Sequence, residues 1–172
     1  MKKAVVALNG FLGDRRNILD IGEMVNTHAS LSQIPYYQRR RGGAAHGGWN
    51  IISKKRIRRW IQSKVDDGYE MVFAGKSFGA WWVLDFFDEG IVGEGATAFL
   101  LDPAHNLSRA ENKTRSVPGS ENIVVIRQEG HRSGYSVTGA TEHIVDATHC
   151  DIERSELVYR ELRKFLEGHG LC

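Results

Sequence analysis

Six segments of the chain combine the length of a strand with a high share of apolar or aromatic residues. Most of them are short continuous apolar runs, which are typical of strands buried on both faces of a parallel sheet. The segments are residues 4–8 (AVVAL), 32–38 (SQIPYYQ), 70–74 (EMVFA), 98–101 (AFLL), 123–126 (IVVI) and 143–145 (HIV). Pro35 counts against the second segment, because proline cannot donate to the hydrogen-bond ladder of a sheet.

Apolar residues spaced three or four positions apart predict helices between these strands. One helix is expected from Ser53, as its cap, to about Asp67, with Gly68 as its stop. Residues 78–88 are apolar almost all round, which indicates a buried helix. Two more amphipathic helices are expected around residues 18–25 and 158–168.

The alternation of strands and helices predicts an α/β fold, with a single domain over residues 1–172. We expect a three-layer sandwich in which about six mainly parallel strands have helices on both faces. Residues 103–120 and 130–140 interrupt the alternation and are rich in Gly, Ser, Asn and charged residues, so we expect loops there. Long loops after strand ends are where such folds carry their chemistry.

Composition and charge exclude several classes of protein. The 172 residues are 41% hydrophobic and 26% charged, which suits one globular domain with a sizeable core. The net charge of +2 provides no overall field that would favour nucleic acid or an anionic membrane, and no segment has the ~20 apolar residues that span a bilayer. Two cysteines, Cys150 and Cys172, provide no disulfide framework, so we expect a cytoplasmic protein.

Residues 75–79 (GKSFG) form a G-x-S-x-G motif between an expected strand and an expected helix. In this context the motif predicts a tight turn that lifts the Ser77 hydroxyl above the edge of the sheet. The glycines on either side allow backbone to approach closely, and the start of the next helix stabilises developing negative charge. Ser77 is therefore the candidate nucleophile.

A serine hydroxyl is a poor nucleophile near neutral pH, so Ser77 needs a base. His149 follows the last expected strand and directly precedes the final helix, which makes it our candidate. His105 and His131 also lie at strand ends and remain alternatives.

The acid that orients the base has two candidates. Asp102 and Glu129 both follow strands whose carboxyl ends lie on the edge that carries Ser77. Asp102 is shorter than Glu129 and precedes a proline. The order Ser77, Asp102, His149 is also the order of nucleophile, acid and base in hydrolases that carry a G-x-S-x-G motif. We favour Asp102 and keep Glu129 as the alternative.

Two backbone N–H groups are expected to bind the oxyanion. One belongs to Phe78, immediately after the nucleophile, and the other to Phe11, in the glycine-containing loop after the first strand.

The motifs at residues 9–11 (NGF), 75–79 (GKSFG), 101–104 (LDPA) and His149 together resemble the α/β-hydrolase superfamily over nearly the whole chain. The resemblance implies a small lidless member that keeps the strands normally numbered third to eighth. The position of its acid is similar to the lipase-type variant, in which the triad acid sits one strand earlier than usual. Asn9 stands where the family often has histidine, and no insertion is long enough for a substantial cap domain.

These residues favour a serine hydrolase that cleaves a carboxylic ester or thioester through an acyl-enzyme on Ser77. The alternatives are an acyltransferase on the same residues and a non-catalytic binding protein that keeps the fold. We expect a small-molecule acyl substrate, which could be anionic if the arginines at 39–41 flank the site. We expect no cofactor and no nucleic-acid partner, and the spacing of His and Cys predicts no metal site. The oligomeric state stays open.

Overall fold

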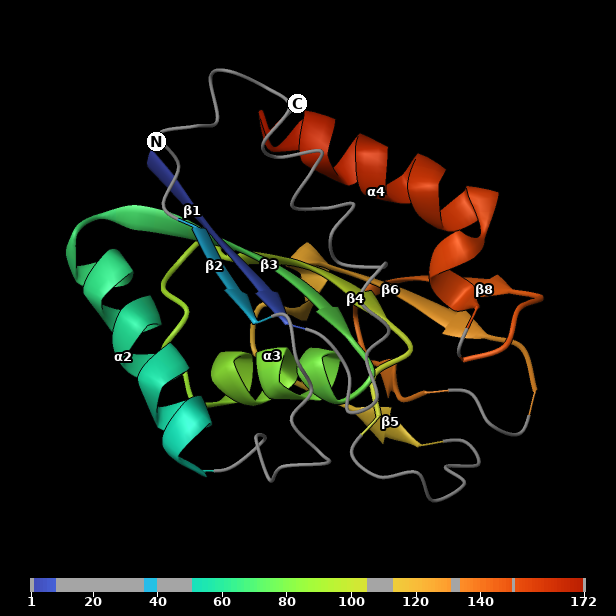
Figure 1. Ribbon diagram of the computed structural model, residues 1–172, viewed down its shortest axis with the longest axis horizontal. Helices are drawn as coiled ribbons and strands as arrows, with labels where there is room; N and C mark the ends of the chain where they lie inside the picture. The colour runs from blue at the N-terminus through green and yellow to red at the C-terminus, as the bar shows by residue number, and fades with distance from the viewer. Residues whose placement is uncertain are drawn as a thin grey trace.

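A computed structural model describes residues 2–8, 36–39, 51–104, 113–130, 134–149 and 151–171. Its main feature is a six-stranded sheet with the order β2-β1-β3-β4-β6-β8, in which every neighbouring pair is parallel (Figure 1). The strands are β1 (Lys2–Leu8), β2 (Tyr36–Arg39), β3 (Tyr69–Lys76), β4 (Thr97–Leu101), β6 (Ile123–Gln128) and β8 (Thr141–Val145). The prediction of six parallel strands is confirmed.

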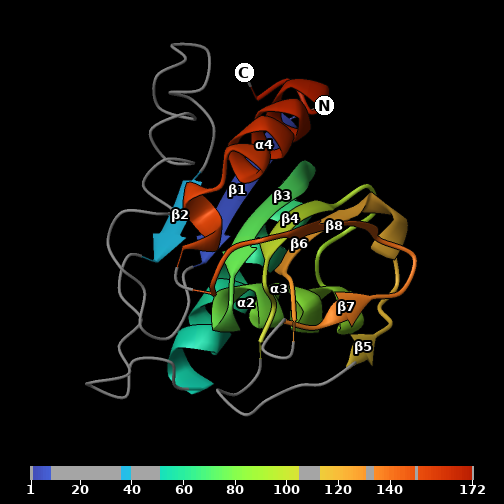
Figure 2. The ribbon, with the colours of Figure 1, turned by 90° about the vertical axis from the view of Figure 1, so that its right-hand side faces the viewer.

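Helices cover both faces of this sheet. The helix α4 (Glu156–Gly168) lies on one face, and α2 (Ile51–Asp66) and α3 (Phe78–Asp88) lie on the other (Figures 1 and 2). The predicted three-layer α/β fold is therefore confirmed. The helix expected around residues 18–25 lies outside the described residues.

The expected start of α2 was wrong. The helix begins at Ile51, so Ser53 lies in its first turn instead of capping it. The predicted stop is confirmed, because Gly68 has a φ of 77°, a conformation that glycine adopts without strain.

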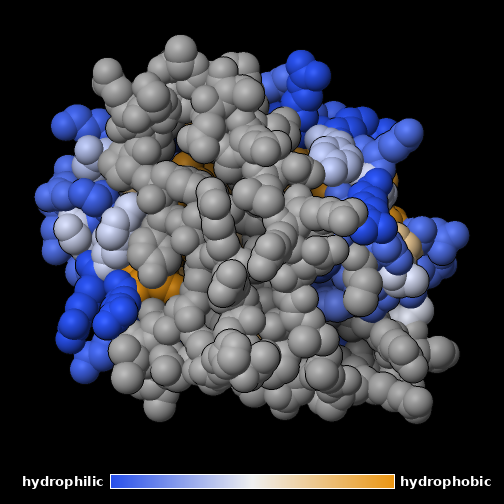
Figure 3. Space-filling view, in the orientation of Figure 1, coloured by the Kyte–Doolittle hydropathy of each residue, from blue (hydrophilic) through white to orange (hydrophobic). Residues whose placement is uncertain are grey.

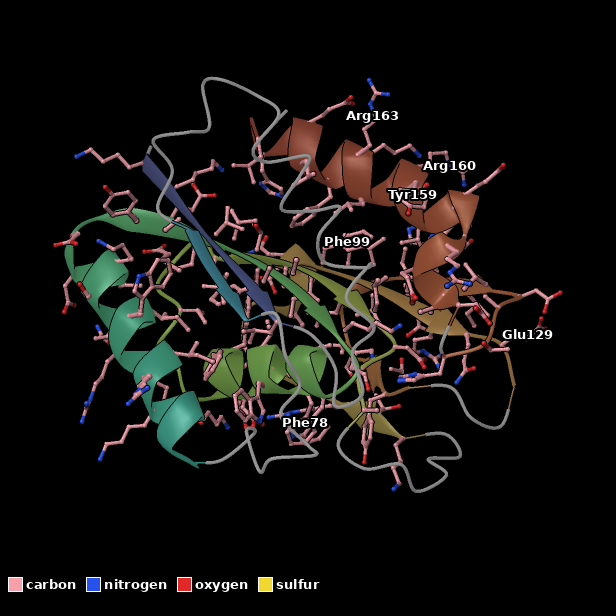
Figure 4. The ribbon with its side chains drawn as sticks, in the orientation of Figure 1. Phe78, Phe99, Glu129, Tyr159, Arg160 and Arg163 are labelled. Carbon is pink, nitrogen blue, oxygen red and sulfur yellow. The ribbon has the colours of Figure 1, made fainter. Side chains whose placement is uncertain are left out.

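Two hydrophobic clusters lie on the two faces of the sheet. One contains Phe73 and Leu100 with the inner sides of α2 and α3, and seven of the eleven residues of α3 are buried. The other contains Phe99, which lies between the sheet and α4 (Figure 4) and has its ring centroid 5.7 Å from that of Phe165. The central strands β3 and β4 are therefore packed from both sides and form a rigid support for what lies at their ends.

Two short strands lie in segments that were expected to be loops. The strands β5 (Thr114–Arg115) and β7 (Ser136–Val137) pair in parallel and form a second, two-stranded sheet. Figure 2 shows this small sheet beside α3. Strands of two residues are too short to give a periodic signal in the sequence.

The surface of the described residues is mainly polar. In Figure 3 hydrophilic side chains predominate on both flanks of the face shown. Ile144 is 54% exposed because β8 is the last strand of the sheet. Among the described helices, none has the length and apolar content needed to cross a membrane.

Candidate active site

The turn between β3 and α3 holds Ser77 in an unusual backbone conformation. Ser77 has φ 54° and ψ −121°, which is rare for a residue other than glycine and is typical of a strained functional turn. Its N–H donates to the Leu101 carbonyl (2.8 Å), and its own carbonyl accepts from the N–H groups of Trp81 (3.0 Å) and Ala104 (3.1 Å). The Ser77 side chain makes no capping bond to α3. The backbone is thus fixed while the hydroxyl stays available for another partner.

Gly75 makes this turn possible because α3 passes directly over it. A Cβ atom at position 75 would lie 2.7 Å from the Ala80 Cα and 2.9 Å from the Ala80 nitrogen. Both are backbone atoms, so the neighbour cannot move aside as a flexible side chain would.

We expect Gly75→Ala to lower the free energy of unfolding by about 2 kcal/mol or more, the size of an overpacking penalty in a rigid core. Gly168→Ala is the matched control, because a Cβ there meets no atom within 4 Å and the residue closes a helix. Urea unfolding of both variants checks this, and an equally stable Gly75→Ala protein would contradict the close approach.

His149 contacts the Ser77 side chain. Its Nε2 lies 2.9 Å from the Ser77 Oγ, although the residues are 72 positions apart. The His149 side chain is 32% exposed, whereas Ser77 is 8% exposed. The imidazole is therefore the more accessible member of the pair.

Asp102 holds the other side of the imidazole. It follows β4 with φ 45°, is fully buried, and its Oδ2 contacts the His149 Nδ1. A carboxylate only accepts hydrogen bonds, so Nδ1 carries the proton and Nε2 is left to accept from the Ser77 hydroxyl. The structure therefore brings together the three side chains that were expected to form the site.

Donors surround the Asp102 carboxylate. Oδ1 accepts from the Gly134 N–H (2.5 Å) and the Gln128 N–H (3.3 Å), and Oδ2 accepts from the Gln128 Nε2 (3.2 Å). Hydrogen bonds of this kind offset the loss of water around a buried charge. The sequence analysis missed Gln128 and Gly134, because neither belongs to a motif.

Gly134 has no room for a side chain at this point. A Cβ on it would lie 2.5 Å from the Asp102 carbonyl carbon and 2.6 Å from the Pro103 oxygen. Its carbonyl accepts from Arg127 (3.3 Å), and Arg127 is in turn bound to Glu142 (2.6 Å). The hydrogen bond from the Arg127 guanidinium holds the pKa of the Glu142 carboxyl below its ordinary value, against the opposing effect of burial. The segment that supports Asp102 is thus tied to β6 and β8.

Glu129, the alternative acid, does not face this site. Its side chain is exposed, and Figure 4 shows it at the outer margin of the molecule. The Glu129 N–H donates to the Val145 carbonyl (2.9 Å), which continues the pairing of β6 with β8 by one residue. His105 and His131, the alternative bases, lie outside the described residues.

Of the two expected oxyanion donors, only Phe78 is described. It is the first residue of α3, and its ring packs on that of Trp82 at 5.7 Å between centroids. Phe11 lies outside the described residues, as do the side chains of the arginines at 39–41. The N-terminus of α3 brings its partial positive charge next to the Ser77 hydroxyl.

An open depression of about 670 Å³ is lined in part by the segment that carries His149. Gln128, Glu129, Asp146, Thr148 and Arg154 contribute to its lining, but Ser77 does not. It is therefore not where a group bound to Ser77 would lie. Among the described residues, no cluster of three or more His, Cys, Asp or Glu side chains could hold a metal ion.

No protein-family model and no curated protein sequence matches this chain. Solved structures do match it. The NocB thioesterase domain from the nocardicin cluster is 11% identical with a TM-score of 0.59, over 97% of this chain and 95% of that one. A structure from a study of metagenome-derived lipolytic enzymes is 10% identical with a TM-score of 0.57, over 96% and 94% of the two chains.

A third match is a Xanthomonas campestris pv. campestris protein assigned to the alpha/beta superfamily of hydrolases. It is 11% identical with a TM-score of 0.56, and the match covers 95% of this chain and 99% of that one. All three structures match over nearly their whole length. The chain has the fold of the α/β-hydrolase superfamily.

Proposed function

We propose that this protein is a serine hydrolase that cleaves a small carboxylic ester or thioester through an acyl-enzyme on Ser77. The observation that supports this most strongly is the continuous contact from the Ser77 Oγ to the His149 Nε2 and from the His149 Nδ1 to Asp102. Three side chains from three strand ends converge in the order that nucleophilic catalysis by serine requires.

In the first half of the reaction, the Ser77 Oγ attacks the carbonyl carbon of the substrate while the His149 Nε2 takes the hydroxyl proton. The carbonyl oxygen becomes an oxyanion, which the N–H groups of Phe78 and Phe11 would bind beside the start of α3. The tetrahedral intermediate collapses and its bond to the leaving alcohol or thiol breaks. The leaving group takes the proton from Nε2, and the acyl group remains on Ser77.

In the second half, a water molecule attacks the acyl carbon and gives a proton to the His149 Nε2. Collapse of this intermediate returns the proton to the Ser77 Oγ and releases the carboxylic acid. The buried Asp102 carboxylate keeps Nδ1 protonated in both halves and stabilises the imidazolium when it forms. The 32% exposure of His149 leaves a path for the water.

The substrate class follows from the leaving groups that such a site accepts. An imidazolium at Nε2 can protonate either an alkoxide or a thiolate, so the geometry suits esters and thioesters alike. A thioesterase domain and a structure from a study of lipolytic enzymes share the fold, which supports testing both classes.

The experiment is a turnover assay on acyl esters and acyl thioesters that differ in chain length and charge, with Ser77→Ala as the control. We expect hydrolysis by the native protein and none above background by Ser77→Ala. Transfer of the acyl group to an added alcohol or thiol, in preference to water, would instead assign an acyltransferase. Absence of both reactions across the panel would contradict the proposal and favour a binding protein.

A further inference from the structure

A buried ion pair lies directly behind the candidate active site. The Lys76 ammonium contacts the Glu153 carboxylate, and their side chains are only 11% and 4% exposed. Lys76 is the last residue of β3 and immediately precedes Ser77. Glu153 lies in the short 3-10 helix η4 (Ile152–Arg154), four residues after His149. The pair therefore connects the turn that carries the serine with the segment that carries the imidazole.

In the described part of residues 146–155, apart from the contacts of His149, Ile152 is fully buried in the cluster that contains Val72 and Ala74 of β3, and several hydrogen bonds lie within the segment itself. The N–H groups of Asp151 and Ile152 donate to the Thr148 carbonyl (3.0 and 2.9 Å), and the Thr148 hydroxyl donates to Asp151 (2.6 Å). These hydrogen bonds fix the shape of the segment, and the apolar packing of Ile152 holds the segment on the sheet without fixing a direction. The Lys76–Glu153 pair supplies a directional link between the two.

A buried ion pair of this kind contributes little to the stability of a fold. Removing two charges from water is costly, and an apolar pair of similar volume is often as stable or more stable. An apolar pair, however, fixes no direction, whereas a buried ion pair offsets the loss of water only when its geometry is good. Such geometric control has its largest effect next to reacting groups, where a misplacement of about 1 Å can lower a rate ~10²-fold.

We propose that Lys76 and Glu153 form a positioning pair that holds the His149 imidazole at hydrogen-bonding distance from the Ser77 hydroxyl. The inference rests on the proposed function, because its kinetic consequence is the rate at which Ser77 is acylated. Both side chains are almost fully buried, so the role that we propose for them is indirect. Lys76 acts through Ser77, its neighbour in the chain, and Glu153 acts through the segment that carries His149.

A second ion pair on β3 offers a matched control. Lys3 and Glu70 lie opposite each other at the start of β1 and β3, with 2.9 Å between charged atoms and exposures of 19% and 15%. This pair also joins two elements of the sheet, but at the end away from Ser77. Glu70→Gln removes a similar interaction without touching the candidate site.

We expect Glu153→Gln to lower kcat by about 10²-fold with little change in KM, since transition-state geometry changes and ground-state binding does not. Glu70→Gln should leave both constants unchanged. In proton NMR, the far-downfield resonance of the His149 Nδ1 proton bound to Asp102 should weaken or disappear in Glu153→Gln and persist in Glu70→Gln. His149→Ala assigns that resonance.

The double variant Lys76→Met with Glu153→Met separates positioning from stability. Two methionines fill a similar volume, so we expect the free energy of unfolding to be near that of the native protein. The proposal predicts that kcat stays about 10²-fold low in this stable protein. Recovery of kcat together with stability would overturn it and leave the pair a purely structural one. If Glu153→Gln does not fold, the double variant still distinguishes a positioning role from a purely structural one.

Failure of this inference can be told apart from failure of the proposed function. If the native protein acylates Ser77 and Glu153→Gln does so at the native rate, only the positioning role is contradicted. If the native protein forms no acyl-enzyme, the proposed function fails, and the NMR resonance still tests the positioning role. Its persistence in Glu153→Gln would then contradict that role, and its loss would support it.

Discussion

Replacing Ser77 or His149 by alanine should lower kcat by about 10⁶, and replacing both should lower it hardly further. The reason is that the two side chains act as one unit, in which the Oγ attacks only when Nε2, 2.9 Å away, takes its proton. Once either side chain is missing, the other can no longer take part in this proton transfer. Steady-state kinetics on the three variants, with the best substrate of the ester and thioester panel, measures this.

The folded state should survive these changes. The Ser77 side chain makes no capping bond to α3, and His149 is about one-third exposed, so neither substitution opens a core cavity. Circular dichroism and urea unfolding provide the control. Losses in kcat that multiply in the double variant would show that the two residues act independently, contrary to the mechanism.

Asp102→Asn should lower kcat by about 10⁴ while the protein stays folded. The Oδ1 position accepts hydrogen bonds from the N–H groups of Gly134 and Gln128, so the oxygen of an asparagine would occupy it. The NH₂ group would then face His149 and donate to Nδ1. That bond places the imidazole proton on Nε2, which can no longer accept the proton of the Ser77 hydroxyl.

Glu129→Gln is the matched control, since Glu129 also follows a strand of the sheet but points outward at its margin (Figure 4). It should leave kcat and KM unchanged. The kinetics of the two variants at several pH values provide the measurement. A large loss in Glu129→Gln and none in Asp102→Asn would mean that the acid has been assigned to the wrong strand end.

Local patterns were sufficient to predict most of the fold and the residues that meet at the site. The apolar runs predicted the buried strands, because strands packed on both faces need continuous apolar sequence. The glycines around Ser77 predicted its turn, and Gly75 does lie under the backbone of Ala80. In a parallel sheet, strand ends meet at one edge, which is why Asp102 and His149 could be proposed from their positions alone.

What the sequence did not reveal depends on contacts between distant segments. The Lys76–Glu153 pair spans 77 positions, and no local pattern says which of many charged residues will meet. Gly134 lies 32 positions from Asp102, in a segment with several glycines, and only the close approach of Pro103 distinguishes it. The start of α2 was misplaced for a different reason, since serine is tolerated inside the first turn of a helix as well as at its cap.

Labelling with a fluorophosphonate, followed by peptide mapping, tests the central claim most directly, because the reagent reacts with activated serines and needs no knowledge of the substrate. The account predicts that the phosphonyl group is found on Ser77, that Ser77→Ala is unlabelled, and that His149→Ala is labelled far more slowly than the native protein. A folded native protein that takes up no label, or takes it up at another residue, would contradict the account.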